Sequence, residues 1–173
     1  KYLIAGRFTT VNGSTRLGLA RFNTNDSIDT TFNAFSVNNP NTIDEYSGIK
    51  LLEDGTMYAF HDPEYNFNPQ YPHDIGIIRL NADGSFRSSL RSYARPGKDI
   101  EILPNGKIIA AGDFFNVGDQ SPQSGSFNRY TPDGRHDGSV LVDFYGSSTG
   151  AKEIELLADD KIIVGGDFTQ VVT

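Results

Sequence analysis

KIIAAGDF, at residues 107–114, is the stretch that decides the fold, because similar stretches recur at regular intervals. The same pattern reads KYLIAGRF at 1–8 and KIIVGGDF at 161–168, and a degenerate copy, TMYAF, occupies 56–60. The starting positions of the four copies are 55, 51 and 54 residues apart. Such regular spacing identifies a tandem repeat.

Two further landmarks recur in the same phase of the repeat. An alternating segment precedes the last three copies: IKLLEDG at 49–55, IEILPNG at 100–106 and IELLADD at 154–160. A segment with a polar turn follows the first three: ARFNTNDS at 20–27, IRLNADGS at 78–85 and NRYTPDGR at 128–135. A short run then leads to Phe32, Leu90 or Val140. Each unit thus contains four strand-sized segments, here named strands a, b, c and d in chain order.

These segments have the character of strands in an antiparallel meander. Strand a alternates with a period of two, as in Ile100, Glu101 and Ile102, so one of its faces is buried. Strand b is apolar nearly throughout, as expected for a strand that is covered on both faces. The Asp-Gly and Asn-Gly pairs predict hairpin turns in which both central residues have positive φ.

A repeated meander is typical of a β-propeller, because one meander alone cannot bury both of its faces. The prediction is an all-β chain, a partial propeller of about three four-stranded antiparallel blades in a single array over 1–173. The blade equivalents are 1–45 (partial), 46–95, 96–150 and 151–173 (partial). Open stacked sheets and a β-sandwich are the alternatives. Since propellers close with about four to eight blades, the remaining blades would come from the same polypeptide or from other subunits.

Composition excludes several classes of partner and site. The net charge is −7 and the fifteen basic residues are scattered, which argues against binding to nucleic acid. No run approaches the ~20 apolar residues of a membrane span, so membrane insertion is not expected. The chain has no cysteine, which excludes disulfides and thiolate zinc sites.

The motifs together resemble the delta-60 repeat, a bacterial β-propeller repeat found in large secreted and surface proteins. The resemblance rests on the KII-x-x-GDF strand, the Arg-Leu-Asn-x-Asp-Gly-Ser segment and a following Asp-x-x-Phe, and residues 1–33 show it best. It implies a propeller used for adhesion or protein interaction, with no catalytic residue to transfer. Two copies depart from the pattern: the second lacks the GDF ending, and the third has HDGSV at 136–140 in place of Asp-x-x-Phe.

The candidate binding residues lie in a long aromatic loop between strands b and c of the second unit. In an a-b-c-d meander the a–b and c–d turns share one end, and the b–c and d–a loops share the other. The tight turns are all of the first kind, and the long loops (9–16, 33–45, 61–74, 115–125 and 145–150) are all of the second. A rigid scaffold carries recognition on such loops. The loop 61–74 offers Tyr65, Phe67 and Tyr71, with His61 and His73, to a protein or a carbohydrate; local packing of the aromatic rings is the alternative.

Catalytic and metal-binding patterns are missing from the sequence. It contains no nucleophile elbow, zinc-binding HExxH or phosphate loop, so we predict no enzyme activity, no catalytic residue and no metal site. The Asp- and Asn-rich turns allow only a weak case for calcium, because they fail the calcium-loop pattern and suit hairpins in any event.

The sequence therefore predicts a non-catalytic scaffold or binding module of a large exported bacterial surface or adhesion protein, located outside the cell or at its surface. Two alternatives remain open. One is a virion module, such as a phage tail or fibre component for assembly or receptor binding. The other is a fragment of a carbohydrate-active enzyme built on a propeller.

Overall fold

The computed structural model describes residues 1–34, 45–62, 77–90, 94–114, 125–137, 143–145, 150–159 and 161–172. This part of the chain is all-β, as predicted, and contains fifteen strands and no helix. No segment of it could therefore cross a membrane as a helix. The strands of the first two units are β1 (Tyr2–Ala5), β2 (Thr10–Val11), β3 (Ser14–Thr15), β4 (Leu19–Phe22), β5 (Glu45–Leu51), β6 (Met57–Asp62), β7 (Ile77–Leu80) and β8 (Phe86–Ser89). Those that follow are β9 (Ala94–Ile102), β10 (Ile108–Phe114), β11 (Gly125–Tyr130), β12 (Asp143–Tyr145), β13 (Gly150–Leu156), β14 (Ile162–Asp167) and β15 (Gln170–Val172).

The strands form four principal antiparallel sheets that follow the repeat. The first sheet pairs β1 with β4, and the second has the order β5-β6-β7-β8. The third has the order β11-β10-β9, and the fourth pairs β13 with β14. The second sheet thus shows the complete a-b-c-d meander that the sequence predicts. Small additional pairings join β2 to β3 and β12 to β15.

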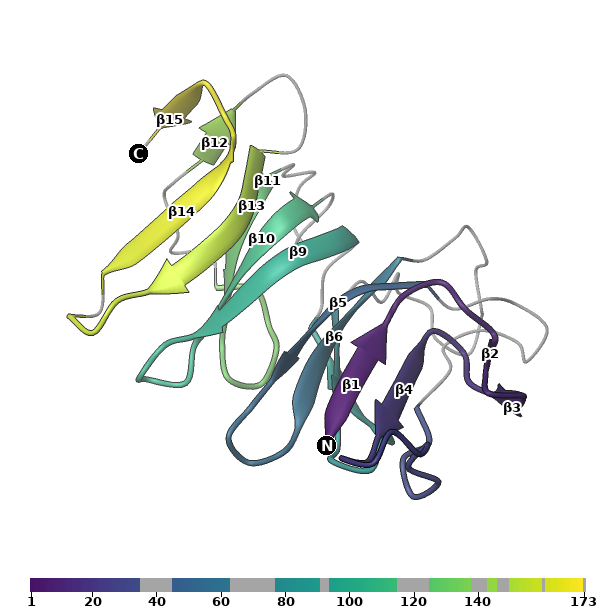
Figure 1. The fold of residues 1–173 in the computed structure, drawn as a ribbon. Coiled ribbons are helices and arrows are strands. Elements are labelled where there is room, and N and C mark those ends of the chain that lie inside the picture. Colours follow the sequence, from purple (N-terminus) through teal and green to yellow (C-terminus); the bar gives the residue numbers. More distant parts are fainter. Residues whose placement is uncertain are drawn as a thin grey trace.

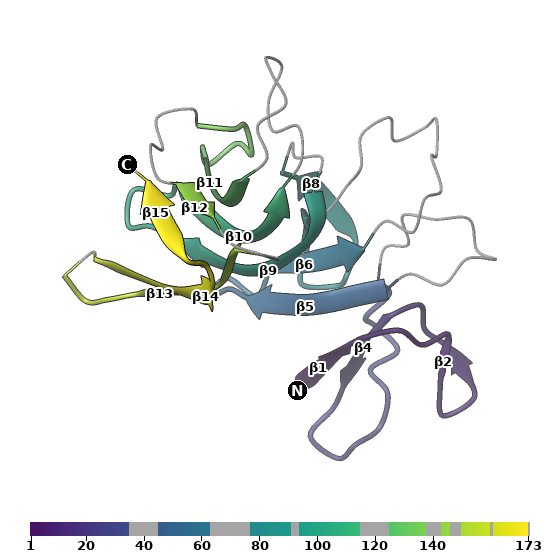
Figure 2. The same ribbon diagram turned by 90° about the horizontal axis from the view of Figure 1, so that it is seen from above.

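In the second, third and fourth sheets, strand a of one sheet lies against strand a of the next, and the other strands fan outward from this line. Strand β9 contacts both β5 and β13, and the three run side by side in Figure 1 and along one edge of the molecule in Figure 2. The a–b turns after β5, β9 and β13 all point the same way, toward the lower left of Figure 1. The ends at which strand a begins and strand b finishes lie opposite those turns.

Among the described residues, the hydrophobic core consists of three clusters, one between each pair of successive sheets. Strand b supplies both neighbouring clusters, because successive side chains point to opposite faces of a strand. In β6, Met57 and Ala59 pack toward the first sheet, whereas Tyr58 and Phe60 pack toward the third. The cluster between the third and fourth sheets includes Ile109, Ala111, Ala151 and Ile154.

The tight turns differ in type from the sequence expectation. At 52–55 the N–H of Gly55 donates to the Leu52 carbonyl and the N–H of Leu52 donates to the Thr56 carbonyl, with positive φ only at Gly55 (+77°). This is a type I turn followed by a glycine bulge, and the pattern recurs at 81–85, 103–107 and 131–135. The prediction of two positive-φ residues was wrong for these turns.

In three of these turns an acidic or amide side chain accepts an extra hydrogen bond that favours this turn type. Asp54 Oδ1 accepts from the Thr56 N–H at 2.9 Å, and Asp83 Oδ1 accepts from the Ser85 N–H at 2.9 Å. A residue in the right-handed region makes this local bond readily. The predicted geometry does occur in the β2–β3 hairpin, where Asn12 (φ +47°) and Gly13 (φ +77°) are both left-handed.

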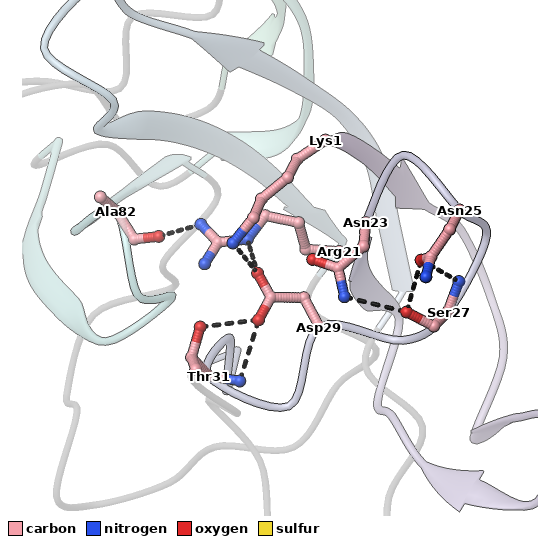
Figure 3. A network of polar contacts seen from close by, with 8 residues as sticks. All are labelled: Lys1, Arg21, Asn23, Asn25, Ser27, Asp29, Thr31 and Ala82. Carbon is pink, nitrogen blue, oxygen red and sulfur yellow. Dashed lines mark hydrogen bonds and ion pairs between the residues drawn. The ribbon is translucent and has the colours of Figure 1, made fainter.

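An ion cluster around a buried aspartate links the segments of strands b, c and d in the first unit (Figure 3). Asp29, with a side chain only 4% exposed, accepts from Lys1 Nζ at 2.7 Å and from Arg21 Nε at 2.8 Å. Its other oxygen accepts from the N–H and hydroxyl of Thr31. The Lys1 and Thr31 bonds hold the pKa of the Asp29 carboxyl well below its ordinary value. We call Lys1, Arg21 and Asp29 the clamp of the first sheet.

The third sheet carries the same clamp. Asp137 accepts from Lys107 Nζ at 2.8 Å and from Arg129 Nε at 3.0 Å. Its N–H also donates to the Arg129 carbonyl, just as the Asp29 N–H donates to the Arg21 carbonyl. The third copy therefore keeps the aspartate of Asp-x-x-Phe, and the expectation that HDGSV replaces this motif was wrong at that position.

The second sheet lacks two of the three clamp residues. Thr56 stands where the other sheets have lysine, and Arg87 stands where they have aspartate. The strand-c arginine, Arg79, turns instead to Asp54 at 3.3 Å and to the Thr56 hydroxyl at 3.1 Å. The position thus keeps an arginine–carboxylate contact although two of the three clamp residues have changed.

Asp29→Asn should lower the melting temperature clearly, because it removes the negative charge that Lys1 and the partly buried Arg21 share. Acid should reduce the difference: because the folded pKa is lowered, the contribution of Asp29 to stability is complete above the unfolded pKa of about 3.9, shrinks below that pH, and is lost only as pH falls through the folded pKa. Thermal unfolding at pH 7 and pH 3 measures both effects. Asp133→Asn, at an exposed turn aspartate, is the matched control and should change little. Equal losses for the two variants at pH 7 would contradict the clamp.

Candidate functional site

Of the binding residues predicted from the sequence, only His61 lies within the described part of the chain. It is the penultimate residue of β6, and its backbone pairs with Tyr46. Tyr65, Phe67, Tyr71 and His73 fall in 63–76, outside the described residues, so their role stays a prediction. The strand pairing places the start of this loop at the end of the sheets opposite the a–b turns. We call that end of the sheets, where strand a begins and strand b finishes, the inner rim.

A β-bulge shapes the inner rim in each of the three sheets that contain strand a. The register between strands a and b shifts between Tyr46 and Gly48, and again between Ala151 and Glu153. The third sheet shifts at the equivalent place, between Gly97 and Asp99. The extra residues are Ser47, Lys98 and Lys152. A bulge redirects the side chains beside it, and bulges are common near functional sites. The bulges of this repeat therefore reorient the side chains at the inner rim.

The bulges of the third and fourth sheets border a hollow of about 550 Å³, lined by Lys98, Asp99, Lys152 and Glu153. Asp99 fixes the geometry between the two sheets, because its Oδ2 accepts from the Ile154 N–H at 2.8 Å and its Oδ1 from the Ile100 N–H at 2.8 Å. Lys152 is paired with Asp167. Lys98 and Glu153 are exposed and offer one charge of each sign to a ligand. Such a site suits a polar, hydrogen-bonding partner rather than an apolar one.

An ion pair also connects the second and third sheets through their a strands. Lys50 and Glu101, which occupy equivalent positions of the repeat, form an ion pair across the two strands. Glu155 holds the same position in the fourth sheet and is exposed. For Lys50 and Glu101 this position therefore provides a contact between two sheets.

A second hollow, of about 460 Å³, lies between the first and second sheets. It is lined by Thr15, Arg16, Leu17, Leu19, Asn33, Ala34, Ser85 and Phe86. Arg16 Nη1 donates to the Thr15 carbonyl at 2.7 Å, while Arg16 Nε is buried without a hydrogen-bond partner. The repeat has no equivalent of this arginine, so periodicity gave no signal for it.

The remaining histidine, His136, is a structural residue. Its Nε2 lies 3.2 Å from Asn128 Oδ1, and its ring meets the edge of Tyr130. Burial lowers the pKa of His136, against a smaller opposing effect of Asp137. Within the described ranges, no three His, Cys, Asp or Glu side chains gather as they would to hold a metal ion.

His136→Gln should flatten the loss of stability between pH 7 and pH 5. The folded pKa lies below the unfolded value of about 6.5, so as pH falls through that value the unfolded chain gains a proton before the folded one does, and stability drops. Glutamine removes that proton and can still donate to Asn128. Urea unfolding at pH 7, 6 and 5 measures the slope. An unchanged slope would show that His136 is free to take up its proton in the folded state.

Comparison with known proteins supports the repeat and its fold. Residues 1–32 and 103–139 match the model of a family described as "Domain of unknown function (DUF5122) beta-propeller". The fold is a β-propeller. Both matched segments run from strand b to strand d of the propeller repeat and contain a complete clamp, Lys1 to Asp29 and Lys107 to Asp137. No curated protein and no solved structure matches the chain significantly.

Proposed function

We propose that this propeller is a non-catalytic binding scaffold of the delta-60 repeat type, within a large exported bacterial surface or adhesion protein. Its partner is a protein or a carbohydrate held at the inner rim. One observation carries the proposal: the repeat keeps its strand pairing at the inner rim and varies the residues there. The bulge recurs at the same place in three sheets, whereas the bulge positions hold Ser47, Lys98 and Lys152.

The difference between the recurring strand framework and the variable rim residues has a physical reason. Turns and partly buried ion clusters set the strand geometry, so changing them costs stability, while an exposed bulge residue can change at little cost. The residue after each bulge varies too: Gly48, Asp99 and Glu153. Surface loops and strand ends on such a fixed frame are where recognition is expected. The placement outside the cell rests on the resemblance of the repeat to those of bacterial secreted and surface proteins.

A binding screen tests the proposal. The purified chain would be applied to an array of bacterial and host glycans and to immobilised extracellular proteins. A triple variant of the aromatic loop, Tyr65→Ala, Phe67→Ala and Tyr71→Ala, should lose at least tenfold in affinity for whatever the parent binds. The double variant Leu51→Ala and Leu157→Ala is the matched control, because both leucines are exposed at the opposite end. It should bind as the parent does.

Three outcomes would overturn the proposal. The parent chain could bind nothing on either array, or the aromatic-loop variant could bind as tightly as the parent. Turnover of an arrayed glycan would instead establish the carbohydrate-active alternative. Thermal unfolding of each variant shows whether a loss of binding reflects a loss of fold.

A further inference from the structure

The hollow between the first and second sheets contains a positive charge that no described residue neutralises. Three described cationic residues, Arg16, Arg87 and Lys98, form no ion pair, and of the three only Arg16 is partly buried. Its Nη1 donates to the Thr15 carbonyl, and its Nε is buried without a hydrogen-bond partner. A charged group with a buried, unpaired donor costs stability. The hollow therefore favours a ligand that brings a negative charge.

The residues around Arg16 leave this charge available to a ligand. None of the eight residues that line the hollow is acidic, although the chain carries a net charge of −7. Asp83 lies next to the lining residue Ser85, but its Oδ1 accepts from the N–H and the hydroxyl of Ser85 within their own turn. A guanidinium stays charged at every physiological pH. In an otherwise acidic protein, such a site selects for an anion.

The rest of the lining indicates what the anion is attached to. Leu17, Ala34 and Phe86 supply apolar surface on both sides of the hollow. Asn33 is exposed and bonds to Asp83 through its backbone N–H, so its side-chain amide can serve a ligand. The volume of about 460 Å³ lies in the range of small-molecule sites, roughly 300–1,000 Å³. The matching ligand has a carboxylate, an apolar group and an amide close together.

We propose that this hollow binds the carboxylate of an N-acylated apolar amino acid, which is the group that ends a polypeptide chain. The carboxylate pairs with the Arg16 guanidinium, whose planar fork offers two donors to one carboxylate. The apolar side chain of the ligand lies against Leu17 and Phe86, and its amide bonds to the Asn33 side chain. Capture of a terminal carboxylate is a recurring mode of peptide recognition. The inference does not depend on the partner proposed for the inner rim.

The test compares N-acetyl-leucine with N-acetyl-leucinamide, which keeps the shape and the apolar group but lacks the negative charge. Titration of the whole chain, followed by two-dimensional NMR, gives the affinity and locates the site. N-acetyl-leucine should bind with a Kd on the order of 1 mM, as expected for so small a ligand. It should shift the Nε–H resonance of Arg16 and the backbone resonances of Phe86. The amide should bind about tenfold more weakly, because it forms no ion pair.

Arg16→Gln should remove the preference for the acid, since the variant and the amide lose the same contact. Arg135→Gln is the matched control: it changes the net charge equally, at an exposed turn arginine paired with Asp133, and should leave binding unchanged. Thermal unfolding shows that each variant is folded. N-acetyl-Ala-Ala-Leu and its amide identify the source of the ligand. Tighter binding of the tripeptide acid than of N-acetyl-leucine supports a chain end, and equal binding supports a free acylated amino acid.

Three results would overturn the inference. The acid and the amide could bind equally well, or neither could bind at ten times the expected Kd. The resonances that move could belong to residues away from the hollow. A folded Arg16→Gln variant that still prefers the acid would show that another group holds the carboxylate.

Discussion

Gly84→Ala should destabilise the protein by about 3 kcal/mol, while Gly55→Ala should cost only about 1 kcal/mol. Both glycines end a type I turn and both have left-handed φ, +90° and +77°. They differ in their surroundings. A methyl group on Gly84 would lie 2.9 Å from the backbone of Asn33, whereas one on Gly55 would meet only the Ala82 side chain at 3.5 Å. Gly84 therefore adds a steric clash to the conformational cost.

The clash matters because this turn joins two sheets. The Asn33 N–H donates to the Asp83 carbonyl at 2.8 Å, and Arg21 of the first sheet donates to the Ala82 carbonyl. An alanine at 84 must push the turn away and strain both bonds. Gly134→Ala should behave similarly, since its methyl group would lie 2.9 Å from the Ser89 carbonyl oxygen. Urea unfolding gives the free energies. Equal losses for the variants at 84 and 55 would mean that the close approach is irrelevant.

Phe32→Ala should cost about 3–5 kcal/mol. Phe32 is completely buried between the first and second sheets, in the cluster with Leu19, Met57 and Leu80. The Arg21 guanidinium lies over its ring, 4.7 Å from the centre. The substitution removes the side chain that joins the two sheets and leaves a cavity that rigid strands cannot fill.

The loss should be local, which distinguishes a repeat array from a single undivided core. Hydrogen exchange should accelerate in β1 and β4 and remain nearly unchanged in β13 and β14. Phe32→Leu is the matched control, because Leu90 performs the same task between the second and third sheets. It should cost less than about 1.5 kcal/mol. Uniform acceleration across all sheets in the alanine variant would contradict the idea of separate interfaces.

Much of the fold was predictable because the repeat displays its own period. The apolar run of strand b and the alternation of strand a lead directly to the observed order β5-β6-β7-β8. The turn type was not predictable from the Asp-Gly pair alone. The choice depends on whether Asp54 bonds to the Thr56 N–H, a local competition that the dipeptide does not reveal. The blade boundaries stay predictions.

The site was predictable only in part. The sequence placed the recognition loops at one end, and pairing of Glu45 with Asp62 brings strand ends together there. The Ala-Gly and Gly-Gly ends of strand b, at 111–112 and 165–166, permit a bulge, and the pairing of strands a and b shifts register there. The hollow beside Lys98 and Lys152 depends on those bulges and on the contact between β9 and β13. Only a structure brings together residues 54 positions apart.

Because side chains alternate along strand b, its two faces contact different neighbouring repeats, and this limits how a repeat can be duplicated. Met57 and Tyr58 are adjacent in the chain, yet each belongs to a different interface. The residue at position 57 must therefore fit the preceding repeat, and the residue at position 58 must fit the following one. A copied unit would be accepted beside a new neighbour only if one set of alternate residues suited the unit before it and the other suited the unit after it. Such an array can lengthen by whole repeats without a new core, but shuffling its units out of order would break two interfaces at once.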